Sequence, residues 1–235
     1  MTLQLFTTVV FLTLFMACNS QTKPDGQHPP ANKNILRATK LSIEEINKLD
    51  SVEFDFQIRG SCYAFSNPVN AEPSNGEAHS PNIAEKIDET FPHQGLYLAI
   101  NDQELLQIDS NFLGCNLYLV NTSDSNVILD AQDSRLDIIA EALNENNEWI
   151  PITYLPSSWC GNSYHKITLD KNEYWSFAIP IFKGKIKTKL RYTLSVKKDQ
   201  KIFSNEITAY LNKGQFDTQK KQGHTSSDIM DPYND

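Results

Sequence analysis

The sequence lacks the short motifs that identify most enzymes dependent on a metal, a nucleotide or a serine nucleophile. Its five histidines are scattered, and none pairs with another at the spacing of zinc ligands. It contains no Walker loop, no Gly-x-Gly-x-x-Gly and no Gly-x-Ser-x-Gly. These absences argue against a zinc enzyme, a P-loop or dinucleotide-binding enzyme and an α/β-hydrolase. We therefore expect neither a metal nor another cofactor.

Basic residues are in the minority. The chain has 21 Lys and Arg against 29 Asp and Glu, which gives a formal net charge of −8. Binding to nucleic acid needs a dominant basic surface that neutralises phosphates, so we expect no nucleic-acid partner. After residue 17, no segment reaches the roughly 18 consecutive apolar residues of a membrane-spanning helix.

Residues 1–17 contain no Asp, Glu, Lys or Arg and are mostly apolar, which is typical of a signal peptide. They end in Phe15-Met16-Ala17, followed by Cys18, and this tetrapeptide resembles the lipobox of bacterial lipoproteins. The resemblance implies cleavage before Cys18, acylation of this cysteine and anchoring in a membrane by the acyl chains. Asn19 follows in place of Asp, which in the enterobacterial sorting pattern favours the outer membrane. The alternative is a membrane-embedded N-terminus in which Cys18 is an incidental thiol.

Composition divides the rest of the chain into a tether, a folded domain and a tail. We expect residues 18–40, rich in Pro, Asn, Gln and Lys, to be a flexible tether. The folded domain is expected over residues 41–211, with an N-terminal extension at 41–94 and its core at 95–211. Residues 212–235 are polar, and we expect them to be disordered.

Alternation of apolar and polar residues predicts a domain built of short strands. From residue 95 onward, we expect strands at 96–100, 116–120, 127–129, 136–143, 149–154, 174–181, 185–196 and 202–211. Residues 136–143 also fit one face of a helix. Before residue 95, we expect a short helix capped by Ser42 and Glu45, a strand at 51–59 and a helical turn near 83–87 within a long loop. The fold class is therefore mainly β, an antiparallel immunoglobulin-like β-sandwich with a short N-terminal helix and long loops.

The last two predicted strands carry a family resemblance. Lys189-Leu190-Arg191-Tyr192-Thr193-Leu194-Ser195-Val196, a polar turn and then Ile202-Phe203-Ser204-Asn205-Glu206-Ile207 resemble the closing hairpin of fibronectin type III and related immunoglobulin-like domains. The resemblance implies that the strand bearing Tyr192 crosses the core. It implies a fold and no particular activity, because such sandwiches have many functions.

Three cysteines remain after Cys18, an odd number for an exported chain. One disulfide and one free thiol is the simplest arrangement, with three possible pairings among Cys62, Cys115 and Cys160. We favour Cys62–Cys160, because both stand in turns, and expect Cys115 to be buried. Cys160 with His165 would instead suit a nucleophile and its base, which is the basis for an alternative function as a hydrolase.

Cationic residues recur at every second position over one predicted strand. They are Lys183, Lys185, Lys187, Lys189 and Arg191. Leu190, Tyr192 and Leu194 have the opposite parity, so one face of the strand should be cationic and the other should lie in the core. This cationic strip suits lipid head groups, an acidic glycan or an acidic protein. The alternative is that the lysines protect an exposed sheet edge from pairing with another chain.

Together these observations predict a lipid-anchored protein of the bacterial cell envelope, a non-catalytic binding or structural module. Its expected partners are the membrane, through the lipid anchor, and an envelope protein or an acidic glycan. The alternative is a secreted hydrolase that uses Cys160 and His165, or a pair of carboxylates.

Overall fold

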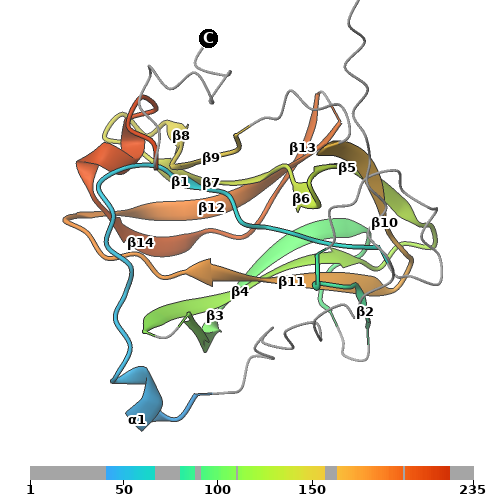
Figure 1. Ribbon diagram of the computed structural model, residues 1–235, viewed down its shortest axis with the longest axis horizontal. Helices are drawn as coiled ribbons and strands as arrows, with labels where there is room; N and C mark the ends of the chain where they lie inside the picture. The colour runs from blue at the N-terminus through green and yellow to red at the C-terminus, as the bar shows by residue number, and fades with distance from the viewer. Residues whose placement is uncertain are drawn as a thin grey trace, which may run out of the picture. The chain divides into compact units, whose positions relative to one another are not determined.

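The computed structural model describes residues 41–66, 80–87, 91–109, 111–156, 163–197 and 199–222 (Figure 1). The predicted leader, Cys18 and the predicted tether lie outside these residues. None of the helices in the described ranges is long and apolar enough to cross a membrane.

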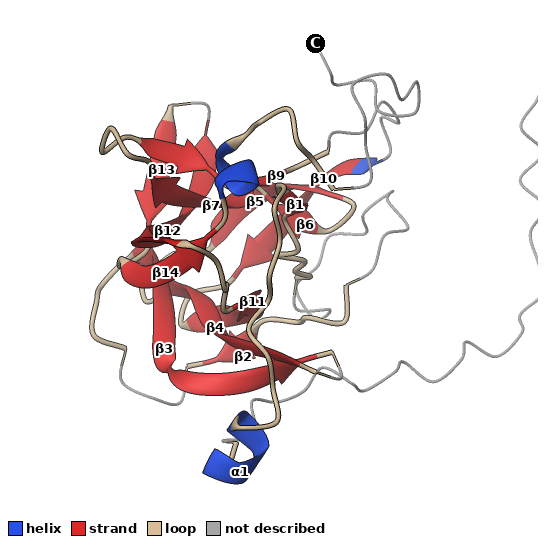
Figure 2. Ribbon diagram, turned by 90° about the vertical axis from the view of Figure 1, so that its left-hand side faces the viewer, coloured by secondary structure: helices blue, strands red, loops and turns tan. Residues whose placement is uncertain are grey.

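Two antiparallel sheets form the main layers of the domain (Figures 1 and 2). The first sheet has the order β2-β11-β4-β3, and its strands are β2 (Glu85–Lys86), β3 (Leu96–Ile108), β4 (Phe112–Asn121) and β11 (Glu173–Pro180). The second has the order β13-β12-β7-β8, with β14 also paired to β12. Its strands are β7 (Ile138–Leu143), β8 (Trp149–Pro151), β12 (Ile186–Lys197), β13 (Gln200–Phe203) and β14 (Ile207–Leu211).

Smaller strand pairs complete the fold. A three-stranded antiparallel sheet has the order β10-β5-β6, formed by β5 (Val127–Gln132), β6 (Arg135–Leu136) and β10 (Tyr164–Leu169). Asp133 and Ser134 join β5 to β6 with φ angles of 49° and 64°, the positive values that a two-residue hairpin with the twist of its strands requires. A short parallel pair joins β1 (Ile58–Arg59) to β9 (Thr153–Tyr154).

The core lies between the layers and consists of inward-facing strand residues. Its fully buried members include Leu117, Leu119, Trp175, Leu190 and Leu194. The predicted fold class, a mainly β antiparallel sandwich, is confirmed. Cys115 is fully buried in this core, also as predicted.

Several local predictions can be compared with the structure. The short helix is confirmed as α1 (Ile43–Ile46), with a capping box between Ser42 and Glu45. Residues 136–143 form strand rather than helix, and β2 replaces the helical turn expected near 83–87. Strand β10 is missing from the predicted strands, which pass directly from 149–154 to 174–181.

The segment at 51–59 differs from the single regular strand that its alternation predicts. Only Ile58–Arg59 is strand, and Val52 and Gln57 make isolated bridges to Phe182 and Lys221. Gln57 is buried, and its side-chain amide donates to the Pro151 carbonyl at 2.7 Å. The segment therefore pairs with several partners in turn, which interrupts a regular ladder.

The predicted disordered tail is wrong for residues 212–222. Lys213–Phe216 form the 3₁₀ helix η2, and the Gln215 side chain is buried, accepting from the Asn212 amide at 2.9 Å. Asp55 accepts from the Gly214 amide at 2.8 Å and pairs with Lys220 at 2.5 Å. These hydrogen bonds and this ion pair order the segment although its composition is polar. Residues 223–235 lie outside the described part of the chain.

Candidate functional site

The predicted cationic strip lies on the outer face of β12 and on the segment 183–185 before it. Lys183, Lys185, Lys187 and Lys189 are exposed, while Leu190, Tyr192 and Leu194 are buried at the opposite parity. The period of two thus separates a cationic face from a core face, as the sequence predicts.

The position of β12 in its sheet bears on the edge-protection interpretation. One side of β12 pairs with β14 over Ile186–Leu190 and with β13 from Thr193 onward, and the other side pairs with β7 from Leu190 to Leu194. On the side facing β7, β12 has no partner strand among the described residues at 186–189 and at 195–197. Lys187 and Lys189 lie in the first of these stretches, so edge protection stays a prediction for them.

Arg191 is held by three side chains. Its guanidinium donates to one Glu141 carboxylate oxygen from Nε at 3.0 Å and from Nη2 at 2.8 Å. Its Cζ lies 4.0 Å from the centre of the Trp149 ring and 4.1 Å from that of Phe203. Both charged side chains are largely buried, at 19% exposed for Arg191 and 9% for Glu141. The Arg191 charge is therefore compensated, and the prediction that Arg191 belongs to an open anion-binding strip is wrong.

Of the four lysines in the strip, one forms an ion pair and three form none with the described residues. Lys189 forms an ion pair with Glu206 at 2.7 Å. Lys183, Lys185 and Lys187 form no ion pair with any described residue, and we call them the lysine cluster. The pKa of Asp55 is lowered chiefly by its hydrogen bond to Lys220, then by the Gly214 amide, and to a smaller extent by the charge of Lys185. The cationic strip is thus concentrated at the start of β12.

A groove opens beside the lysine cluster, where β7 and β12 separate. Its volume is about 520 Å³, and it lies between β12 and the turn that joins β7 to β8. Residues of both strands and of β14 line it: Leu143, Asn144, Glu145, Asn147, Ile186, Lys187, Thr188, Lys189 and Thr208. A smaller hollow of about 200 Å³ adjoins it and shares Asn144, Glu145 and Ile186. Lys213 and Phe216 of η2, drawn in blue in Figure 2, line this second hollow.

The predicted disulfide pairs Cys62 with Cys160, and the structure describes only the first of these two cysteines. Cys62 and Cys115 are both free and buried, and Cys160 lies outside the described residues. Cys62 faces the core, where burial raises the pKa of its thiol to about 12. Burial is also the main reason that the pKa of Cys115 rises to about 12. Since the thiolate is the reactive form, neither cysteine is suited to nucleophilic catalysis at neutral pH.

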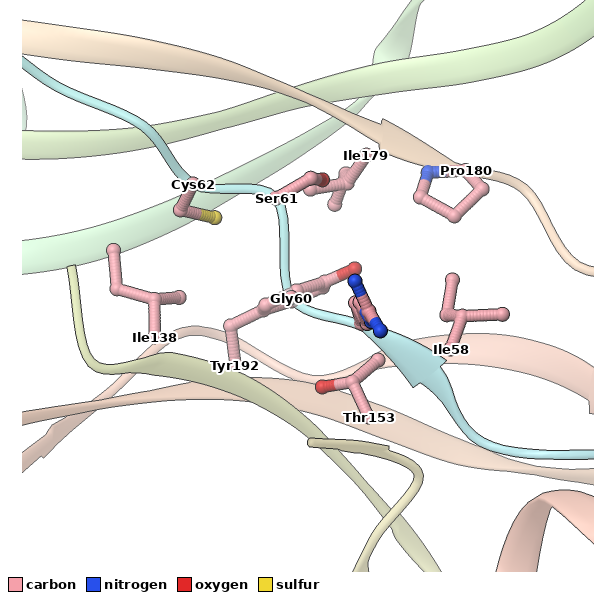
Figure 3. A pocket seen from close by; sticks show the side chains of 10 residues that line it. Ile58, Gly60, Ser61, Cys62, Ile138, Thr153, Ile179, Pro180 and Tyr192 are labelled. Atoms are coloured by element: carbon pink, nitrogen blue, oxygen red, sulfur yellow. The ribbon is translucent and has the colours of Figure 1, made fainter. Parts of the chain in front are cut away.

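A small cavity lies beside Cys62 (Figure 3). Ile138 of β7 and Tyr192 of β12 line it from one main sheet, Ile179 of β11 from the other, and Thr153 from β9 of the short parallel pair. Its volume of about 20 Å³ is enough for roughly one water molecule. Burial, with smaller contributions from Cys62 and Cys115, raises the pKa of Tyr192, so this phenol stays neutral. The cavity is too small for a substrate.

His165, the predicted catalytic base of the alternative, lies on β10. Its Nδ1 is 3.2 Å from the Ser163 carbonyl, and its Nε2 is buried with no hydrogen-bond partner among the residues that the structure describes. Its proposed nucleophile Cys160 lies outside the described residues. Within the described ranges, no group of three or more His, Cys, Asp and Glu side chains could hold a metal ion.

The groove and the partners of Arg191 are absent from the features that the sequence predicts. Glu141, Trp149 and Phe203 are 50, 42 and 12 residues from Arg191 along the chain, so only the sheet brings them together. The alternation of inward and outward residues on each strand, combined with the pairing of β7 with β12, is the signal that would have placed Glu141, Trp149 and Phe203 on the outer face of the sheet with Arg191. No protein-family model matches the chain, and no curated protein matches it in sequence.

Proposed function

We propose that the protein is a lipid-anchored, non-catalytic binding module of the bacterial cell envelope, which holds an acidic ligand at the lysine cluster. The observation that carries the proposal is the set of three exposed lysines, Lys183, Lys185 and Lys187, without an ion pair among the described residues. Exposed cations spaced along one short segment attract a ligand of opposite charge and hasten its association. The net charge of −8 makes this cationic patch a local feature on an acidic chain.

The anchor in this proposal rests on the sequence. Cys18 follows an uncharged apolar leader and precedes a polar stretch of about 20 residues. Two or more acyl chains on this cysteine would hold the protein stably at a membrane, since one chain alone gives only reversible binding. The polar stretch would place the binding domain away from the membrane surface.

Replacing Cys18 by serine is expected to abolish both leader cleavage and acylation. The intact mass of the protein extracted from membranes should correspond to residues 18–235 plus acyl chains, and the Cys18→Ser protein should carry neither change. Mass spectrometry of the two proteins tests this. A wild-type mass equal to the unmodified full chain would contradict the anchor.

Neutralising the lysine cluster is expected to weaken binding of acidic polymers by at least about tenfold. The variant is Lys183→Gln with Lys185→Gln and Lys187→Gln, and the probes are polygalacturonate and polyglutamate, measured by calorimetry at low and high salt. Binding by the wild type should fall as salt rises, because the attraction is between exposed charges.

The matched control replaces Lys48, Lys166 and Lys171 by glutamine. These side chains are also exposed, and the change in net charge is the same. Lys166 pairs with Asp130, but both side chains are more than two-thirds exposed, so losing this pair costs little. Equal losses in the two triple variants would show that net charge alone governs binding, and the proposal would then be wrong.

A further inference from the structure

The groove beside the lysine cluster has the size of a ligand site. Its volume of about 520 Å³ is within the roughly 300–1,000 Å³ typical of small-molecule sites in proteins. It exists because the pairing of β7 with β12 stops at Leu190 and Ala142, after which β7 enters its turn. The groove is therefore built into the sheet rather than formed by a loose loop.

The wall of the groove is held in place by hydrogen bonds. Asn144 Oδ1 accepts from the backbone amides of Asn146 and Glu148, both at 2.9 Å, which fixes the turn between β7 and β8. Thr188 Oγ1 donates to the Leu143 carbonyl at 2.7 Å and ties β12 to the end of β7. A preformed wall reduces the entropy lost when a ligand binds.

The lining combines neutral polar groups and apolar surface with one cation that forms no ion pair within the described part of the chain. Lys187 contributes the cation, and Asn147 and Thr208 contribute an exposed amide and an exposed hydroxyl. Leu143 and Ile186 contribute half-buried apolar side chains. A sugar acid offers the matching groups, a carboxylate, several hydroxyls and a C–H face.

Negative charge in the groove restricts how densely charged an acidic ligand can be. Glu145 lines the groove, and Glu206 compensates Lys189, so the site is not uniformly cationic. A densely charged polyanion would meet repulsion from Glu145, whereas a chain with one carboxylate per unit can place its hydroxyls there. An acidic glycan therefore fits better than an acidic peptide segment or an anionic membrane surface.

The adjoining hollow extends the groove to a second unit. It shares Asn144, Glu145 and Ile186 with the first, and Lys213 supplies a second cation without an ion pair in the described chain. We infer that the two hollows together bind an acidic oligosaccharide, with one uronic acid carboxylate at Lys187 and another at Lys213. This inference rests on the proposed function, because it names the ligand class for the same cationic surface.

The test measures binding of trigalacturonate to the full chain purified in detergent, with its methyl ester and triglutamate as comparison probes. Lys187→Gln and Lys213→Gln are each expected to weaken trigalacturonate binding by about tenfold, and Thr208→Val by about threefold. The control Lys48→Gln should bind as the wild type does, and the methyl ester should bind at least about tenfold more weakly.

The outcomes separate this inference from the function on which it rests. Equal affinity for triglutamate and trigalacturonate, or an unchanged affinity in both lysine variants, would overturn the oligosaccharide inference and leave an acidic ligand at the lysine cluster. Failure of every acidic probe, including polygalacturonate and polyglutamate, would overturn both.

Discussion

Replacing Trp175 by alanine is expected to lower the free energy of unfolding by about 3–5 kcal/mol, the range for removing a large aromatic side chain from a core. Trp175 is fully buried on β11, next to Leu119 of β4 in the cross-strand register. Its indole Nε1 also donates to the Phe65 carbonyl at 3.0 Å, so the substitution removes both packing and a hydrogen bond. Urea denaturation followed by circular dichroism measures the change.

Trp175→Phe keeps the variant series informative if the alanine protein does not fold. It preserves most of the apolar volume but removes the indole donor, so we expect a smaller loss of about 1–3 kcal/mol. Since a domain has only about 5–15 kcal/mol of stability, the alanine substitution should remove a large part of it. A loss below about 1 kcal/mol in Trp175→Ala would contradict the position of this residue at the centre of the core.

The fold class could be predicted from the sequence because burial of one face of a strand makes apolar residues recur at every second position. One side of each strand faces the core, and this is visible at Leu190, Tyr192 and Leu194 without any knowledge of their partners. The capping box of α1 is equally local, since Ser42 and Glu45 are three residues apart. Both predictions depend on groups that are near each other in the sequence.

Predictions that depend on distant partners did not succeed. The sequence around Cys62 resembles a turn, but its side chain enters the core. The polar residues at 212–222 suggested disorder, yet Asp55 and Gln57 lie far away in the sequence and hold them. The candidate site has one part of each kind. The outward position of Lys187 follows from local alternation and could be predicted. The groove beside it depends on where β7 separates from β12, which are distant in the sequence.

Replacing Arg191 by alanine is expected to destabilise the protein by about 3 kcal/mol, near the lower end of the cost of breaking a buried ion pair. Glu141 would keep a largely buried carboxylate without its cation, and the Trp149 and Phe203 rings would lose the guanidinium between them. The loss should appear in the free energy of unfolding measured in urea.

The matched double variant Arg191→Met with Glu141→Leu separates the charge from the packing. It leaves no buried charge and preserves most of the apolar volume, so its stability should lie within about 1 kcal/mol of the wild type. Its affinity for trigalacturonate should be unchanged, because the lysine cluster and the groove lining are intact. If the double variant were stable but bound acidic polymers about tenfold more weakly, Arg191 would belong to the ligand site after all. The cationic strip would then act as one surface along the whole of β12, rather than being divided by the Glu141 and Glu206 ion pairs.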